Sequence, residues 1–399
     1  MNFYKLLGLT HEEFAEKYEN TGLVERRYHA EFPLDLLCYS RKCVHESVWD
    51  KATSLCRGVI ITRGQEGHDG GEIIARPFEK FHNYGAIVGE YAGAGGPQAA
   101  GAFGEPVVWE KMDGFMCTMY RWENKDYIAS KGSFHSIHAK WATAQIRAKF
   151  GDRLPVVLGG KTLVFEGLHR DLRIVIDYKE RQELVLLAVI DNETGEEYST
   201  ESLESVAMEL GFNTPLNFQL TIEQARAASL GDGKCDEEGY VLTWYRDGVP
   251  PFRLKMKFIE YLRLHRMVTG VSPKRIWEVL STDQSIELQE YLKQSTPWFA
   301  AFAKKWVKAM QAEYDRLHGE AHTRFQCAQI MLKDDSQRNW DKPHSIRKAY
   351  AERFTTPENK EFSGILFAML DGKQIAPVIW KMVRHMTHGA NPMVDAHNT

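Results

Sequence analysis

A lysine, an aspartate and a glycine lie close together in Lys111-Met112-Asp113-Gly114, between two apolar stretches that are typical of strands. One interpretation of this segment is a turn between strands with a solvated lysine. The other makes Lys111 a nucleophile, with Gly114 allowing the backbone to approach a bound ligand closely. A string of four residues cannot decide between them, so the choice depends on the residues that follow.

Two glutamates further along the chain could accept hydrogen bonds or bind a cation. Glu166 ends the apolar stretch Leu163–Phe165, and Glu238 precedes another one, Gly239–Val241. An ionised carboxylate only accepts hydrogen bonds, which suits the hydroxyls of a ribose, and carboxylate oxygens are ligands for Mg²⁺. We therefore expect Glu166 at a ribose and Glu238 at a Mg²⁺ or Mn²⁺ ion.

Three cations alternate along the stretch Phe252–Phe258, which has the pattern of a strand. Because side chains alternate with a period of two, Arg253, Lys255 and Lys257 share one face, and apolar residues share the other. Three neighbouring cations repel one another unless an anion lies over them. The alternative is a solvated face of an edge strand, where lysines prevent aggregation.

These residues together could transfer a nucleotide to a lysine. The unperturbed pKa of lysine is about 10.4, and neighbouring cations such as Lys255 and Lys257, together with a bound Mg²⁺, would lower the pKa of Lys111. The free amine could then attack the α-phosphate of ATP, form a lysyl-AMP and release pyrophosphate. The two lysines of the strand would stabilise the charge that develops on the phosphate.

The order of these segments resembles the covalent nucleotidyltransferase superfamily, which includes DNA ligases, RNA ligases and mRNA capping enzymes. The resemblance lies in Lys111-Met112-Asp113-Gly114, Phe165-Glu166-Gly167, Glu238-Gly239 and Lys255-Met256-Lys257. Within the superfamily, the sequence is most similar to the phage-type RNA ligase 1 family, over roughly residues 30–266. Three further segments support this similarity, namely Cys56–Ile60, Ala75–Tyr84 and Ser130–Ser133.

The resemblance implies a set of nucleotide-binding residues, of which Lys111, Lys255 and Lys257 are expected to be catalytic. The set comprises Arg57, Lys80, Glu110, Lys111, Gly114, Lys131, Glu166, Glu238, Lys255, Lys257 and Tyr261. Taken singly, several of these have simpler interpretations: Arg57 could cap a strand, Lys80 could be a surface lysine, and Lys131 could lie in a turn. Their order along one chain favours the ligase interpretation.

The elements that would position these residues change character near residue 268. Before it, short β-type stretches such as Arg57–Ile61 and Ile174–Tyr178 alternate with helical ones such as Ala139–Phe150 and Thr200–Leu210, which predicts an α+β domain built on antiparallel sheet. The glycine-rich segment Tyr91–Gly104 is expected to be a loop. After residue 268, apolar residues recur at helical spacing, for example over 285–294. We predict a nucleotidyltransferase domain with an N-terminal extension over 1–267 and an all-helical domain over 268–399. DNA ligases and capping enzymes usually carry a β-barrel here, so the helical tail favours the RNA ligase interpretation.

Composition adds limits on location and partners. The sequence has no apolar run long enough to span a membrane and no signal-peptide pattern at its start. Its six cysteines are scattered, as in reduced cytosolic proteins, so a cytoplasmic location is expected, in the host if the gene is from a phage. The net charge of −4 neither indicates nor excludes a local channel for nucleic acid.

The sequence therefore predicts an ATP-dependent RNA ligase that joins 5′-phosphate and 3′-hydroxyl ends of RNA, with no membrane or protein partner. One alternative is the same chemistry in a DNA ligase or a GTP-dependent capping-type enzyme. Another is a non-catalytic nucleotide- or RNA-binding module of the same fold.

The pair His135 and His138 also has metal-binding spacing, but no acidic or cysteine cluster accompanies it.

Overall fold

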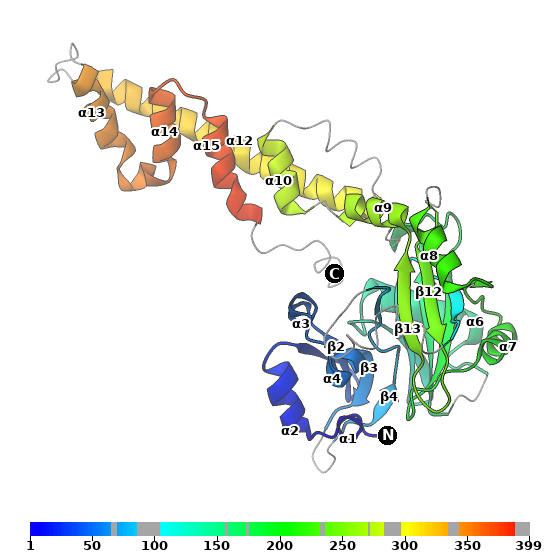
Figure 1. The fold of residues 1–399 in the computed structure, drawn as a ribbon. Helices are drawn as coiled ribbons and strands as arrows, with labels where there is room; N and C mark the ends of the chain where they lie inside the picture. Colours follow the sequence, from blue (N-terminus) through cyan, green and yellow to red (C-terminus); the bar gives the residue numbers. More distant parts are fainter. Residues whose placement is uncertain are drawn as a thin grey trace. The chain divides into compact units, whose positions relative to one another are not determined.

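The computed structural model describes part of the chain, and all structural statements below concern that part. The described ranges are 1–64, 70–85, 104–155, 159–172, 175–231, 236–269, 272–282, 297–333 and 343–387. Packing divides the chain into two compact units, one from Met1 to His265 and one that begins at Arg266. The first combines helices with three sheets, and the described part of the second is helical (Figure 1). The predicted α+β class with a helical C-terminal region is confirmed.

The first sheet is built from residues near the N-terminus, in the order β1-β2-β3-β4. Its strands are β1 (Val24–Tyr28), β2 (Leu34–Tyr39), β3 (Arg57–Thr62) and β4 (Ile73–Ala75). Short helices accompany it: α1 (Phe3–Leu7), α2 (His11–Phe14), η1 (Ala15–Glu19), α3 (Arg41–Glu46) and α4 (Lys51–Leu55). Phe3 and Phe14 pack with buried Val59 and Ile61 of β3 in one apolar core. The sequence pattern predicted only β3, the strand that begins at Arg57.

The second sheet follows the Lys111–Gly114 segment and has the antiparallel order β10-β9-β7-β8. Its strands are β7 (Phe115–Trp122), β8 (Lys125–Ser130), β9 (Lys161–Leu168) and β10 (Glu183–Asp191). The helices α6 (Ile137–Phe150) and α7 (Thr200–Leu210) begin at the capping side chains of Ser136 and Ser199. Their buried residues Ala142 and Leu203 share a core with Phe165 of β9.

The third sheet carries most of the predicted site residues and has the order β11-β6-β12-β13-β5. Its strands are β5 (His82–Asn83), β6 (Val107–Glu110), β11 (Asn217–Phe218), β12 (Gly239–Trp244) and β13 (Phe252–Lys257). All its pairs are antiparallel except β13 with β5. Helix α8 (Ile222–Leu230) contributes Ile222 and Ala225 to the core that holds the apolar face of β12 and β13.

One predicted strand, Ile174–Tyr178, is not a strand over its described part, 175–178. The backbone N–H groups of Val175 and Ile176 donate to the Asp113 carboxylate, both at 2.7 Å. A buried N–H group must find an acceptor, and here a side chain supplies it in place of a neighbouring strand. An apolar pattern cannot reveal such an acceptor. The short helix η3 (Arg170–Leu172) precedes this segment.

The second unit has its own apolar core. Its helices, from α9 at the boundary onward, are α9 (Ile259–Thr269), α10 (Pro273–Ser281), α12 (Pro297–Lys333), α13 (Pro343–Phe354), η4 (Pro357–Phe362), α14 (Ser363–Leu370), α15 (Ala376–Val383) and η5 (Arg384–Thr387). Ile276, Met310, Phe354 and Ile379 from four of them are buried together. The loop predicted around 91–104 and the helix predicted around 285–294 lie outside the described residues, except for Gly104. No helix among the described residues is both long and apolar enough to cross a bilayer.

Candidate active site

One face of the third sheet brings distant residues into rows. Residues directly opposite one another on antiparallel strands point to the same side, and every second residue does so along each strand. The rows across β6, β12 and β13 are Lys111–Gly239–Lys257, Trp109–Val241–Lys255 and Val107–Thr243–Arg253. Lys111 continues the end of β6, where its N–H donates to the carbonyl of Gly239 at 2.8 Å. The register therefore places the predicted nucleophile beside two predicted catalytic lysines.

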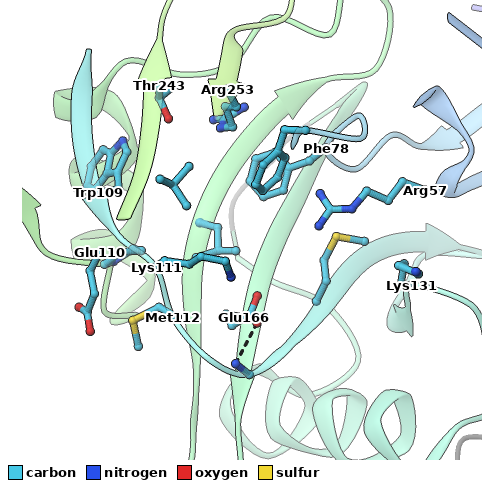
Figure 2. Close-up of a pocket in the computed structure, with 16 residues that line it drawn as sticks. Arg57, Phe78, Trp109, Glu110, Lys111, Met112, Lys131, Glu166, Thr243 and Arg253 are labelled. Atoms are coloured by element: carbon cyan, nitrogen blue, oxygen red, sulfur yellow. Dashed lines mark hydrogen bonds between the residues drawn. The ribbon is translucent and has the colours of Figure 1, made fainter. Parts of the chain in front are cut away.

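A cavity of about 270 Å³ opens beside this face (Figure 2). Six residues predicted from the sequence line it, namely Arg57, Glu110, Lys111, Gly114, Lys131 and Glu166. They come from β3, from the end of β6 and the loop after it, from the turn directly after β8, and from β9. The other five predicted residues, Lys80, Glu238, Lys255, Lys257 and Tyr261, do not line the cavity directly.

Lys111 is held by a buried carboxylate. Its Nζ lies 2.8 Å from Glu238 Oε2, and the other oxygen of Glu238 lies 2.7 Å from Lys257 Nζ. Burial favours the neutral form of Lys111, but the carboxylates of Glu238 and Glu166 outweigh it and raise the pKa above its ordinary value. The lowered pKa that the sequence predicted for Lys111 is therefore not found while this lysine contacts Glu238. Glu238 is only 3% exposed, and its two lysine partners outweigh the effect of burial and lower its pKa.

Four cations form a cluster without a carboxylate partner among the described residues. Burial, followed by repulsion from Lys80 and Lys111, lowers the pKa of Lys255 to about 7. Burial, followed by repulsion from Arg57 and Lys131, lowers the pKa of Lys80 to about 8. The Arg57 Nη1 atom is buried and has no hydrogen-bond partner in the described part of the chain. Such a cluster is chemically suited to bind an anion with several oxygens.

Aromatic rings hold three of these cations in place. Lys80 lies 5.0 Å from the ring centre of Trp49, and Arg57 lies 4.8 Å from that of Phe81. Lys131 lies 4.4 Å from the ring centre of Tyr39, whose hydroxyl accepts from its Nζ at 3.3 Å. A ring face attracts a cation without neutralising it. The cations are therefore positioned and still carry charge for a ligand.

Gly114 and Glu166 join the loop after Lys111 to β9. The Gly114 N–H donates to Glu166 Oε1 at 3.1 Å (Figure 2). A Cβ atom at Gly114 would lie 2.3 Å from the carbonyl oxygen of Gly167, so only glycine permits this approach. Burial raises the pKa of Glu166 to about 7 in spite of the charge on Lys111.

Asp113 was not assigned a role from the sequence, although the Lys111–Gly114 string contains it. Its carboxylate is 2% exposed and accepts from the Tyr261 hydroxyl at 2.7 Å as well as from Val175 and Ile176. Its N–H donates to the Tyr178 hydroxyl at 2.8 Å. Tyr261, predicted among the nucleotide-binding residues, is thus placed on Asp113 and holds the loop that carries Lys111.

Arg253 is already neutralised by a carboxylate of the protein. The sequence suggested instead that a bound anion lies over the three alternating cations. The Arg253 guanidinium forms two bonds with the Glu197 carboxylate, one of them at 2.5 Å. The same group lies 4.5 Å from the ring centre of Phe78, another lining residue that the sequence did not single out. Because Lys257 also pairs with Glu238, only Lys255 of the three lacks a carboxylate partner among the described residues.

The acidic residues fit a hard divalent cation that is shared with a phosphate ligand. No group of three or more His, Cys, Asp or Glu side chains among the described residues could hold a metal alone. Mg²⁺ does not require such a cage, since it is usually bound by one or two carboxylates together with substrate phosphates. Glu238, beside Lys111 and near the cation cluster, is the carboxylate that could serve in this way.

Comparison with known protein families identifies the family of this chain. The family model described as RNA ligase, of the phage RNA ligase 1 type, matches residues 55–261, more than half of the chain. Among solved structures, an archaeal ATP-dependent RNA ligase is 14% identical, with a TM-score of 0.45 over 77% of this chain and 82% of that one. A Naegleria gruberi RNA ligase variant with ATP and Mn is 18% identical, with a TM-score of 0.33 over 43% of this chain. The match covers 54%, about half, of the length of the Naegleria protein. No curated protein matches the sequence.

Proposed function

We propose that this chain, which belongs to the RNA ligase family, joins RNA ends at the expense of ATP through an AMP carried on Lys111. One observation carries the proposal. Lys111 lies in a cavity beside a cluster of four cations, Arg57, Lys80, Lys131 and Lys255, that has no carboxylate partner among the described residues. An amine beside a cluster of cations is suited to attack a bound polyphosphate, because the cations bind the phosphates next to the nucleophile.

In the first step, Lys111 Nζ attacks the α-phosphate of ATP, an N–P bond forms and pyrophosphate leaves. The amine must lose its proton first, and the contact with Glu238 opposes this because it stabilises the ammonium form. When Glu238 turns away from Lys111, burial and the neighbouring cations lower the pKa of the lysine. A Mg²⁺ or Mn²⁺ ion held by Glu238 and the phosphates would supply further positive charge at the reacting phosphorus.

The next two steps use the same site. The AMP passes from Lys111 to the 5′-phosphate of an RNA end, which gives that phosphate a good leaving group. A 3′-hydroxyl then attacks the activated phosphate, the strand is joined and AMP leaves. Lys255 and its neighbouring cations stabilise the charge around phosphorus in each step, as phosphoryl-transfer sites do.

The test is to incubate the protein with Mg²⁺ and ATP labelled at the α-phosphate, beside Lys111→Ala. We expect a label that survives denaturation in the native protein and is absent from the variant, because the variant lacks the amine that forms the phosphoramidate. Lys125→Ala is the matched control, since that side chain is half exposed on β8 and should label normally. Equal labelling of the Lys111 variant, or none of the native protein, contradicts the proposal.

The polymer and the donor nucleotide are tested next. Single-stranded RNA with a 5′-phosphate and a 3′-hydroxyl should be joined faster than nicked DNA, and ATP should label the protein better than GTP. The opposite preferences would support a DNA ligase or a capping-type enzyme. Tight ATP binding without a covalent adduct would support a non-catalytic module.

We also propose a cytoplasmic location, which suits the free thiols of Cys38, Cys43, Cys56, Cys117 and Cys327.

A further inference from the structure

Thr243 on β12 carries a hydroxyl that the fold leaves unused. The side chain is 0% exposed and lines the cavity, and its Oγ1 has no hydrogen-bond partner in the described part of the chain. Figure 2 shows this hydroxyl directed into the space between Trp109 and Arg253. A buried polar group without a partner is unfavourable, so one that faces a binding cavity points to a partner in the ligand.

The position of Thr243 relative to Lys111 matches the length of a nucleotide. The row that contains Thr243 lies two rows from the row of Lys111. Because each residue of a strand advances about 3.4 Å, the two rows lie roughly 13 Å apart along the sheet. A lysine side chain that carries a phosphate, followed by a ribose and a base, can cover that distance. Thr243 is therefore placed at the end of the ligand that is opposite to its phosphates.

The chemistry of the two ends of the cavity supports the same orientation. Arg57 and Lys131 lie at one end, apart from Thr243 (Figure 2). Around Thr243 the lining apart from Arg253 is apolar or aromatic and includes Val241, Trp109 and Phe78, surfaces against which a flat base can pack.

The charged group beside Thr243 already has a partner. The Arg253 guanidinium is paired with the Glu197 carboxylate. Among the described side chains that line this end of the cavity, Thr243 contributes a buried hydroxyl without a partner, which is available to a ligand.

We propose that Thr243 Oγ1 forms a hydrogen bond with the six-position of the purine base and so orients the nucleotide for attack by Lys111. This inference rests on the proposed function, because it takes ATP as the ligand of the cavity. Towards adenine, the hydroxyl accepts from the exocyclic amino group. A hydroxyl can also donate, so it fixes the position of a purine without choosing adenine over guanine.

The experiment compares ATP with purine riboside triphosphate, which lacks the six-amino group, in the native protein and three variants. Thr243→Val keeps the shape and removes the hydroxyl, and Thr243→Ser keeps the hydroxyl. Thr118→Val is the matched control, because Thr118 is equally buried and its hydroxyl is unpartnered, but it does not line the cavity. The readouts are the nucleotide concentration for half-maximal labelling of Lys111 and the dissociation constant from calorimetry.

For Thr243→Val we expect both quantities to rise about tenfold with ATP, the size of effect that one neutral hydrogen bond gives. The maximal labelling rate should fall less than twofold, Thr243→Ser should restore most of the ATP affinity, and Thr118→Val should behave as the native protein. With the analogue, Thr243→Val and the native protein should give equal values. Equal ATP affinity in the Thr243→Val and native proteins, or an equal loss with both nucleotides, overturns the inference.

A failure of the proposed function would be recognised separately. If the native protein takes no label from ATP, the ligase proposal fails, but calorimetry still compares ATP with the analogue in the Thr243→Val and native proteins. The thermal unfolding midpoint of Thr243→Val without nucleotide should equal or exceed that of the native protein, because a methyl group replaces an unpartnered hydroxyl. A lower midpoint would show that the hydroxyl serves the fold and would overturn the inference.

Discussion

The charges at the site are divided between neutralised and unneutralised residues. Glu238 holds Lys111 and Lys257, and Glu197 holds Arg253, whereas Lys255 has no carboxylate within ion-pair distance among the described residues. Lys255 is also partly buried, and both burial and the other cations disfavour its ammonium form. The ammonium group of Lys255 is therefore unfavourable in the folded protein without a ligand. Such a group is expected at a site where a bound anion neutralises its charge.

The pH dependence of stability tests the state of Lys255. Its pKa is about 7 in the folded protein, and it returns to about 10.4 on unfolding, so between these values the unfolded chain binds the extra proton. The native protein should consequently gain stability as pH rises from 7 to 9. Lys255→Met, which has no charge to bury, should be more stable than the native protein at pH 6.5, with a smaller advantage at pH 9.

Urea unfolding at pH 6.5 and pH 9 measures this difference. The matched control is Lys125→Met, because Lys125 is half exposed and its replacement should change stability equally little at both pH values. An advantage of Lys255→Met that stays constant between the two pH values would contradict the lowered pKa.

At the scale of elements, the loop after β6 is fixed by contacts with segments far apart in the sequence. Gly114 contacts the end of β9. The Asp113 carboxylate accepts hydrogen bonds from the backbone of Val175 and Ile176 and from the hydroxyl of Tyr261 on α9. These contacts set the direction in which Lys111 leaves the sheet. Since a small misplacement of a nucleophile is costly, the loop is as important to the proposed reaction as the residues that touch the nucleotide.

Gly114→Ala tests the close approach of this loop to β9. An added Cβ would lie 2.3 Å from a backbone oxygen, so either the loop or β9 must move. We expect labelling of Lys111 to fall at least about 100-fold, since such a displacement can cost that much in rate. Gly159→Ala is the matched control, because a Cβ there meets no atom within 4 Å. Labelling of Gly114→Ala at the rate of the control would contradict the steric argument.

At the scale of the whole molecule, the chain is divided in charge as well as in fold. The second unit carries 19 lysines and arginines against 15 acidic residues, a net charge of +4, although the whole chain has −4. The first unit is therefore acidic and yet contains every residue that lines the cavity. A local cluster of cations can thus exist in a unit whose net charge is negative, which is why composition could not decide on nucleic-acid binding.

The independence of the first unit can be tested by shortening the chain. A fragment of residues 1–270 keeps the cavity, Glu238 and Tyr261, so we expect it to form the lysyl-AMP at a rate within about threefold of the full chain. Circular dichroism first establishes that the fragment is folded. A folded fragment that takes no label would contradict the proposal that 1–267 is a complete nucleotidyltransferase domain.

The residue types, their order and most of the elements that carry them follow from the amino-acid sequence alone. The strand that ends directly before Lys111 and the strands that bear Glu166 and Lys255 were predicted correctly because apolar alternation is a local property of the chain. The helical character of the tail followed from spacing in the same way. The K-x-D-G string and the lysine pair also indicated a lysine nucleophile and phosphate-binding cations, because those functions depend on residue type and order.

Which charges cancel and which remain depends on the tertiary structure. The pairing of Glu238 with Lys111 joins residues 127 positions apart, and that of Arg253 with Glu197 joins residues 56 apart. No local pattern encodes such contacts, because they arise from strand register and from the packing of separate sheets. The raised pKa of Lys111, the role of Asp113 as an anchor and the unpartnered hydroxyl of Thr243 all depend on these long-range contacts and on burial.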